Sequence, residues 1–190
     1  RYSPTRVMVW DGGSGYDDLP DCYDNDLASS DPFRLYATNS FLLIGYSTPF
    51  NVLYCFQATT QPNTVAASLN YGYSDGSGNW PEFESVSDTM STGGVPWSTA
   101  TLDNDPDADG TGIVLFPRNS AWAQETHDGV TAYWLRIDPD QSLDEVRVDD
   151  FYVGVRSPKA ADLAAVMALA PSAWANWDDD ADGVDIFNAT

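Results

Sequence analysis

Hydrophobic and polar residues form short alternating runs along most of the chain. From Phe41 onward, β-favouring runs are separated by clusters of Gly, Pro, Asn, Asp and Ser. The apolar runs are residues 7–10, 41–44, 50–57, 65–73, 113–116, 130–137 and 146–155. Short strands with turn signals between them are typical of sandwiches and barrels. We therefore predict an all-β fold, an antiparallel β-sandwich of jelly-roll type.

The faces of two predicted strands can be assigned from the pattern. The run Tyr133–Ile137 places alternate residues on opposite sides of a strand. One side carries Tyr133, Leu135 and Ile137, and the other carries Trp134 and Arg136. Glu145–Asp149 alternates apolar and charged residues in the same way. Both segments are predicted to be half-buried strands.

The two ends of the chain differ from this β-rich middle. We predict a loop-rich N-terminal arm over residues 1–34, a β-sandwich over 35–156, and a C-terminal helix with an acidic tail over 157–190. The helix covers Lys159–Ala170, after Pro158, and ends at Pro171. Its residues at helical spacing are Leu163, Val166, Met167 and Ala170. This apolar face either closes the sandwich or packs on a neighbouring subunit.

The charge balance excludes several partners. The chain has 190 residues and a net charge of −21, with 25 Asp, 4 Glu, 7 Arg and one Lys, Lys159. Such a field repels nucleic acid and anionic lipid, and no apolar run approaches the ~18–20 residues of a membrane span. Abundant Asp with almost no Lys suggests a surface suited to high salt; a mesophilic calcium protein is the alternative. The chain begins with Arg1 and has no signal-peptide pattern, which suggests a trimmed, processed or incomplete start.

Catalytic signals are weak. The single histidine, His127, lies in Gln124–Gly129, which reads as a hairpin with Asp-Gly at its apex. The pattern Gly-x-Ser-x-Gly occurs once, at Gly72–Gly76, but Gly78 and Pro81 follow it in place of the helix that a nucleophile elbow requires. No other Ser or Cys stands out as a nucleophile with a histidine base nearby in the sequence. The many acids allow chance pairs suited to glycoside hydrolysis. We therefore expect no enzyme activity, with a glycan-active enzyme domain as one alternative.

Two aspartate-rich loops are candidate calcium sites. Asp105–Gly110, with Asp103 just upstream, and Asp178–Gly183 both match the opening of a calcium-binding loop, in which alternate carboxylates converge on a hard cation. The candidate ligands are Asp103, Asp105, Asp107, Asp109, Asp178, Asp180 and Asp182. Position twelve of each loop is Phe116 or Ala189 instead of Glu, so neither is an EF-hand. No cofactor is required, and Ca2+ is the candidate; a solvated acidic turn is the alternative.

Cysteines and exposed aromatics leave further alternatives open. Cys22 and Cys55 could form a disulfide, or Cys55 could be a small buried hydrophobic residue within its strand. Trp80, Trp97 and Trp122 lie near predicted loops, where they could form a carbohydrate-binding platform. Core packing accounts for most aromatics of a β-sandwich at least as well.

Several motifs, in a shared order, resemble a module of virion proteins. They are Phe41–Gly45 with Pro49-Phe50, then Leu69–Tyr73, Gly78–Trp80, Gly112–Pro117 with Trp122, and Gly129–Ile137. Together they resemble a jelly-roll β-sandwich module of structural proteins in tailed viruses, such as head decoration, turret, tail or baseplate proteins. About half of the chain is covered. Gly72, where that module often has Trp, and the acidic loop at residues 103–109 depart from the pattern.

The resemblance implies a non-enzymatic virion structural protein that bridges or projects from the particle, located on the capsid or tail surface. Its partners would be the major capsid protein or other virion proteins, with no nucleic acid and no membrane, and it would form homo-oligomers. Composition points to a halophilic or marine host. Apolar anchors for these partners are predicted at Val7, Val9, Trp10, Leu163, Val166, Met167 and Trp174. The main alternative is a carbohydrate-binding or host-adhesion module.

Overall fold

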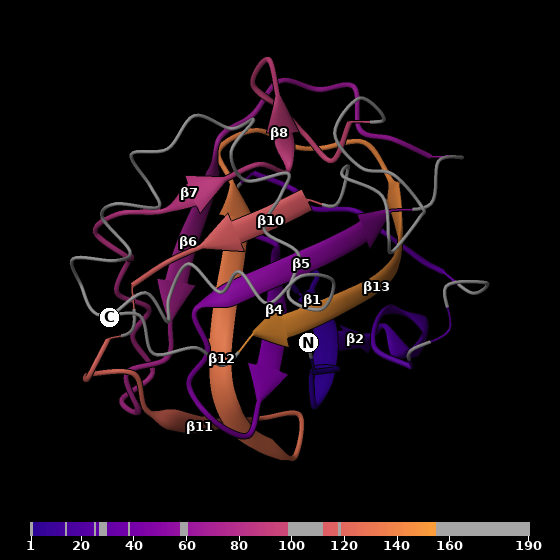
Figure 1. The fold of residues 1–190 in the computed structure, drawn as a ribbon. Coiled ribbons are helices and arrows are strands. Elements are labelled where there is room, and N and C mark those ends of the chain that lie inside the picture. The colour runs from indigo at the N-terminus through magenta and orange to yellow at the C-terminus, as the bar shows by residue number, and fades with distance from the viewer. Residues whose placement is uncertain are drawn as a thin grey trace, which may run out of the picture.

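Two antiparallel sheets face each other in the computed structural model, which describes residues 2–13, 15–24, 26, 30–37, 39–57, 61–98, 112–117 and 119–154 (Figure 1). In these residues the first sheet has six strands in the order β11–β12–β4–β1–β2, and β6 also pairs with β12. They are β1 (Arg6–Trp10), β2 (Tyr16–Asp18), β4 (Phe41–Tyr46), β6 (Leu69–Tyr73), β11 (Gln124–His127) and β12 (Val130–Pro139). The fold is thus an all-β sandwich, as the sequence predicts.

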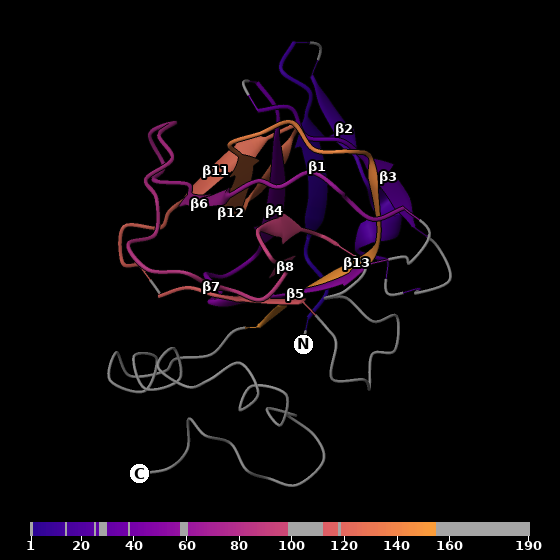
Figure 2. The ribbon, with the colours of Figure 1, turned by 90° about the horizontal axis from the view of Figure 1, so that it is seen from above.

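The second sheet has five described strands in the order β3–β13–β5–β10–β7. They are β3 (Asp31–Phe33), β5 (Val52–Gln57), β7 (Ser87–Asp88), β10 (Gly112–Leu115) and β13 (Val146–Gly154). A separate two-stranded sheet joins β8 (Ser91–Thr92) to β9 (Val95–Pro96), and a short 3-10 helix, η1, spans Pro20–Cys22. Figure 2 shows the two large sheets as layers, with β5, β7 and β13 on one side and β1, β4, β11 and β12 on the other.

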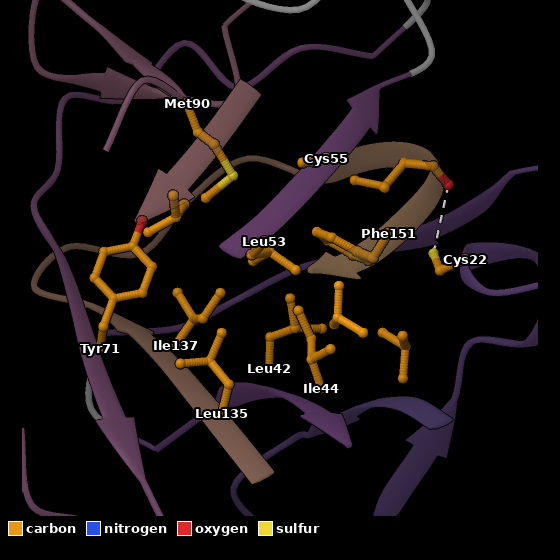
Figure 3. Packing of buried hydrophobic residues seen from close by; sticks show 14 of the residues in the cluster. Cys22, Leu42, Ile44, Leu53, Cys55, Tyr71, Met90, Leu135, Ile137 and Phe151 are labelled. Atoms are coloured by element: carbon orange, nitrogen blue, oxygen red, sulfur yellow. Dashed lines mark hydrogen bonds between the residues drawn. The ribbon is translucent and has the colours of Figure 1, made fainter. Parts of the chain in front are cut away.

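The core lies between the two layers and follows the period-two alternation of the strands. Leu42 and Ile44 of β4 and Leu135 and Ile137 of β12 face Leu53, Cys55 and Phe151 of the opposite sheet (Figure 3). The labelled core side chains of both β4 and β12 are fully buried. The predicted division of β12 is confirmed: Leu135 and Ile137 belong to this core, whereas Trp134 packs in a second cluster on the other face.

The N-terminal segment belongs to the sandwich, which corrects the expectation of a separate loop-rich arm. Strand β1 pairs with both β2 and β4, so it lies inside the six-stranded sheet. Val7 and Val9 are buried in the core at 0% and 5% exposure. Their predicted role as partner anchors is therefore wrong, because their side chains already pack within this chain.

The fold also bears on the predicted hairpin and on the two cysteines. The hairpin at Asp128-Gly129 is confirmed: β11 pairs with β12, and both turn residues have positive φ, 45° and 77°. Cys22 and Cys55 are free, buried thiols, and the Cys22 thiol donates to the Val148 carbonyl oxygen at 3.4 Å.

The helix predicted at 159–170 and its anchors Leu163, Val166 and Met167 lie outside the described residues, as does Trp174. The jelly-roll connectivity stays a prediction. Among the described residues no helix is long and apolar enough to cross a bilayer.

Candidate functional site

The outer face of the six-stranded sheet carries a second apolar layer. Met8, Leu43 and Trp134 point away from the main core because they alternate with Val7, Leu42 and Leu135 on their strands. Met8 lies opposite Leu43 in the β1–β4 register. With Ala132 these residues form a small buried cluster of their own. A sheet face that usually meets water is thus apolar here, and it supports further aromatic side chains above it.

Trp134 is fixed at the base of this layer by a glycine on the neighbouring strand. Gly45 lies opposite Trp134, and a Cβ at residue 45 would meet the ring carbon Cζ3 of Trp134 at 2.5 Å. The absence of a side chain therefore lets the indole lie flat across β4. The Trp134 Nε1–H donates to the Glu125 carbonyl oxygen at 3.0 Å. Trp134 is fully buried as a result.

Five half-buried rings surround this base, and we call them the outer aromatic cluster: Trp10, Tyr16, Phe41, Trp80 and His127. Neighbouring rings lie within contact distance around a closed circuit. The centroid distances are 5.0 Å for Trp10–Tyr16, 6.3 Å for Trp10–Phe41, 6.3 Å for Phe41–Trp80, 5.4 Å for Trp80–His127 and 5.8 Å for Tyr16–His127. The cluster therefore joins β1, β2, β4 and β11 with the loop that follows β6.

The β11–β12 hairpin closes this circuit from the far edge of the sheet. Strands β12 and β4 lie between β11 and β1, yet Arg6 of β1 pairs with Asp128 of the hairpin turn at 3.1 Å. Arg6 also pairs with Asp18 of β2 at 2.7 Å. These contacts require the hairpin to bend back over the outer face, where His127 reaches Tyr16.

His127 connects the two sides of the cluster through both ring nitrogens. Its Nδ1 lies 3.0 Å from the Tyr16 hydroxyl, and its Nε2 lies 3.0 Å from Glu125 Oε2. These two contacts fit the neutral imidazole tautomer in which the Tyr16 hydroxyl donates to Nδ1 and Nε2–H donates to the Glu125 carboxylate. Burial raises the pKa of Tyr16, and the negative charges of Glu125 and Asp128 raise it further. Tyr16 therefore remains a neutral hydrogen-bond donor at ordinary pH.

The loop that carries Trp80 is held by two carboxylates. Asp75 accepts hydrogen bonds from the backbone N–H groups of Ser77 and Asn79 and from the Asn79 side chain, which lower the pKa of Asp75. Glu125 accepts the Gly78 N–H at 2.9 Å. Glu125 thus holds both the Trp80 loop and His127 in place.

Arg136 supplies a cation within the cluster. Its guanidinium carbon lies 4.2 Å from the Phe41 ring centroid and 5.9 Å from that of Trp80, which are cation–π distances. Its Nη2 forms an ion pair with Asp138 at 2.7 Å, and its Nε is buried without a hydrogen-bond partner. A guanidinium has five N–H donors, so the donors on the two Nη atoms, and not the buried Nε–H, could bind a ligand oxygen.

The site contains some of the residues predicted from sequence and excludes others. Trp80, a predicted platform residue, belongs to the outer aromatic cluster. Trp10 also belongs to it, although the sequence predicted Trp10 as an anchor for a partner protein, a role that stays a prediction. The predicted platform residues Trp97 and Trp122 are buried in the main core at 0% and 4% exposure, so their assignment to an exposed platform is wrong. Their loops fold inward: Trp97 meets Phe33 edge-on at a centroid distance of 5.6 Å, and the Trp122 ring lies 4.9 Å from that of Phe50.

Tyr16, Phe41, His127 and Arg136 were not predicted from the sequence to lie together, although the structure brings them into one cluster. For Arg136 a signal was present, because the alternation of β12 places it beside Trp134 on the outer face. All seven predicted calcium ligands, at positions 103–109 and 178–182, lie outside the described residues. Within the described part of the chain, no group of three or more His, Cys, Asp and Glu side chains could hold a metal ion.

Comparison with known proteins gives structural neighbours only. No family model matches the chain, and no curated protein matches it. One solved structure, CBM32-1 from a family 31 glycoside hydrolase of Clostridium perfringens, has a TM-score of 0.48 at 14% identity and covers 81% of this chain and 97% of its own. A pectin-binding carbohydrate-binding module has a TM-score of 0.43 at 14% identity, covering 84% and 95%. CBM32 of AlyQ, in complex with 4,5-unsaturated mannuronic acid, has a TM-score of 0.41 at 9% identity, covering 80% and 95%.

Proposed function

We propose that this protein is a non-catalytic carbohydrate-binding module and that its glycan lies on the outer aromatic cluster. The observation that carries the proposal is a continuous set of half-buried rings with hydrogen-bonding groups at their edges. Trp10, Phe41 and Trp80 follow one another at centroid distances of 6.3 Å. Neighbouring, partly exposed rings form an apolar surface, and a ligand that covers them removes this surface from water, which favours binding.

The chemistry of a sugar suits this arrangement. A pyranose ring has an apolar C–H face, which can lie on an aromatic ring, and hydroxyl groups around its edge, which need hydrogen-bond partners. Ligand sites commonly combine such an apolar floor with a few well-placed polar groups. The guanidinium of Arg136 can donate to hydroxyl oxygens, and the carboxylate of Asp138 can accept from hydroxyl groups. Because three rings lie in sequence, we propose that an oligosaccharide is bound, so that several sugars contribute.

A glycan screen followed by calorimetric titration tests this proposal. The variant Trp80→Ala removes one ring of the cluster and should weaken binding of the best glycan at least about tenfold. Tyr2→Ala is the matched control, because Tyr2 is 55% exposed and stacks on Tyr46 outside the cluster. Its affinity should stay within about twofold of the wild type. Absence of saturable binding to any glycan, or equal affinity in Trp80→Ala, would refute the proposal.

The virion role implied by the sequence resemblance stays a separate prediction, and none of the three structural neighbours named above bears on it. The same titration discriminates the two functions, because a protein that only cements a capsid needs no sugar site. A host-adhesion protein on a virion would satisfy both. Deletion of residues 158–190 should weaken particle attachment if that segment serves assembly, and normal incorporation of the truncated chain would contradict it.

A further inference from the structure

The charges around the outer aromatic cluster are unequal in sign. Four carboxylates contact the cluster or its immediate supports, and two guanidinium groups oppose them. The carboxylates belong to Asp18, Glu125, Asp128 and Asp138, and the guanidinium groups to Arg6 and Arg136. Each arginine is already engaged by an acid, Arg136 with Asp138 at 2.7 Å and Arg6 with both Asp18 and Asp128. The site therefore has an excess of negative charge.

The rest of the chain adds to this local excess. The net charge is −21, and charges beyond the contact shell contribute to the potential over a site whenever screening is weak. The field of these acids reaches Tyr16: burial raises the pKa of Tyr16 most, the charges of Glu125 and Asp128 raise it further, and the opposing charge of Arg136 lowers it by less. An anionic ligand would have to approach against this potential. It would also have to compete with Asp138 for the Arg136 guanidinium.

We propose that the outer aromatic cluster selects uncharged glycans and discriminates against glycans that carry carboxylate or sulfate groups. This inference rests on the proposed carbohydrate-binding function and names the ligand class for that site. The apolar rings provide contact area for any pyranose, so they do not distinguish a neutral sugar from its acid. Discrimination comes from the carboxylates around the cluster, chiefly Asp138, whose negative charge engages the Arg136 guanidinium that lies over the Phe41 ring.

Matched pairs of oligosaccharides test the inference directly. Cellohexaose, mannohexaose and galactohexaose would each be titrated beside the same chain oxidised at C6, which converts the primary alcohol into a carboxylate. At about 0.1 M salt, where the Debye length is about 10 Å, the neutral member of the binding pair should bind at least about tenfold tighter. At about 1 M salt, where that length is about 3 Å, the ratio should fall at least about threefold. A ratio that does not change with salt would show that the carboxylates do not cause the selectivity.

A charge variant provides a second, independent measurement. Asp138→Asn removes the carboxylate that engages Arg136, so the ratio of neutral to oxidised affinity should fall at least about threefold at low salt. Should this variant fail to fold, the salt titration of the wild-type chain still decides the question. Equal or tighter binding of the oxidised hexasaccharide by the wild type at low salt would overturn the selectivity but leave the carbohydrate-binding function standing. Absence of binding to every oligosaccharide would overturn the function itself.

Discussion

A single methyl group at residue 45 should disturb the base of the outer aromatic cluster. The Cβ of Gly45→Ala would lie 2.5, 2.7 and 2.8 Å from three ring carbons of Trp134. Carbon atoms in good contact are about 3.5–4.0 Å apart, so the indole would have to move by about 1 Å. Trp134 has no exposed surface, and its Nε1–H is bound to the Glu125 carbonyl oxygen. The ring cannot move without displacing other buried groups.

The expected loss of stability follows from the steric overlap at residue 45 and from the hydrogen bond of Trp134. Overpacking of a buried site costs about 1–3 kcal/mol, and a lost hydrogen bond costs about 1 kcal/mol more. We therefore expect Gly45→Ala to lower the free energy of unfolding by about 2–4 kcal/mol. For a chain of this size each kcal/mol corresponds to about 2–4 °C in melting temperature. The main core should keep its packing, because Gly45 and Trp134 lie on the outer face.

Thermal and urea unfolding would measure this effect. Gly13→Ala is the matched control, since a Cβ there meets no atom within 4 Å. In a double-mutant cycle, Gly45→Ala should cost at least about 1 kcal/mol less in a Trp134→Phe background, whose smaller ring leaves room for the methyl group. If Gly45→Ala has the same melting temperature as the wild type, or if the two substitutions are additive in the cycle, Gly45 does not make the room that the Trp134 indole occupies.

Three further predictions concern other parts of the sandwich. Burial raises the pKa of Asp149 from the ordinary 3.8 to about 6. Its ionised form therefore destabilises the fold above pH 6, and this penalty disappears as the pH falls toward 4. Asp149→Asn should be more stable than the wild type by about 1–2 kcal/mol at pH 7, because solvent screens part of the cost, and a stability difference that does not change between pH 7 and 4 would contradict the assignment. Glu125→Ala removes the acceptor for Gly78 and His127 and should lower stability in urea by about 1–3 kcal/mol while weakening glycan binding, with Glu125→Gln less affected. The thiols of Cys22 and Cys55 are buried and free, so a thiol reagent should react with neither in the native protein and with both after unfolding.

Local pattern was enough to predict the longer strands, such as β4, β5, β12 and β13, and the direction of the side chains in β12, but not the short strands β2, β3, β7, β8 and β9. The alternation in β12 separates Leu135 and Ile137 of the core from Trp134 of the outer layer, and the Asp128-Gly129 hairpin follows from turn chemistry. Such features depend on the period of a strand and on the φ preference of a few residues, which neighbouring residues alone determine.

The composition of the site depends instead on contacts between distant segments. Tyr16 and His127 are 111 residues apart, and they meet because the β11–β12 hairpin bends over the outer face. The course of a loop likewise decides whether a tryptophan beside it is exposed, and for this reason Trp97 and Trp122 looked available although both are core residues. Apolar strand residues near the N-terminus are ambiguous in the same way: Val7 suits a docking arm as well as a strand between β2 and β4.

The central claim, that glycans bind on the outer aromatic cluster, is tested most directly by the indole N–H signals of the protein in solution. These NMR signals would be assigned by single Trp→Phe variants and followed as the best glycan is added. We expect the signals of Trp10 and Trp80 to shift with a single saturable affinity, whereas those of the core residues Trp97 and Trp122 should not shift. Saturable binding that leaves Trp10 and Trp80 unchanged would contradict binding at the outer aromatic cluster and place the glycan site elsewhere on the protein.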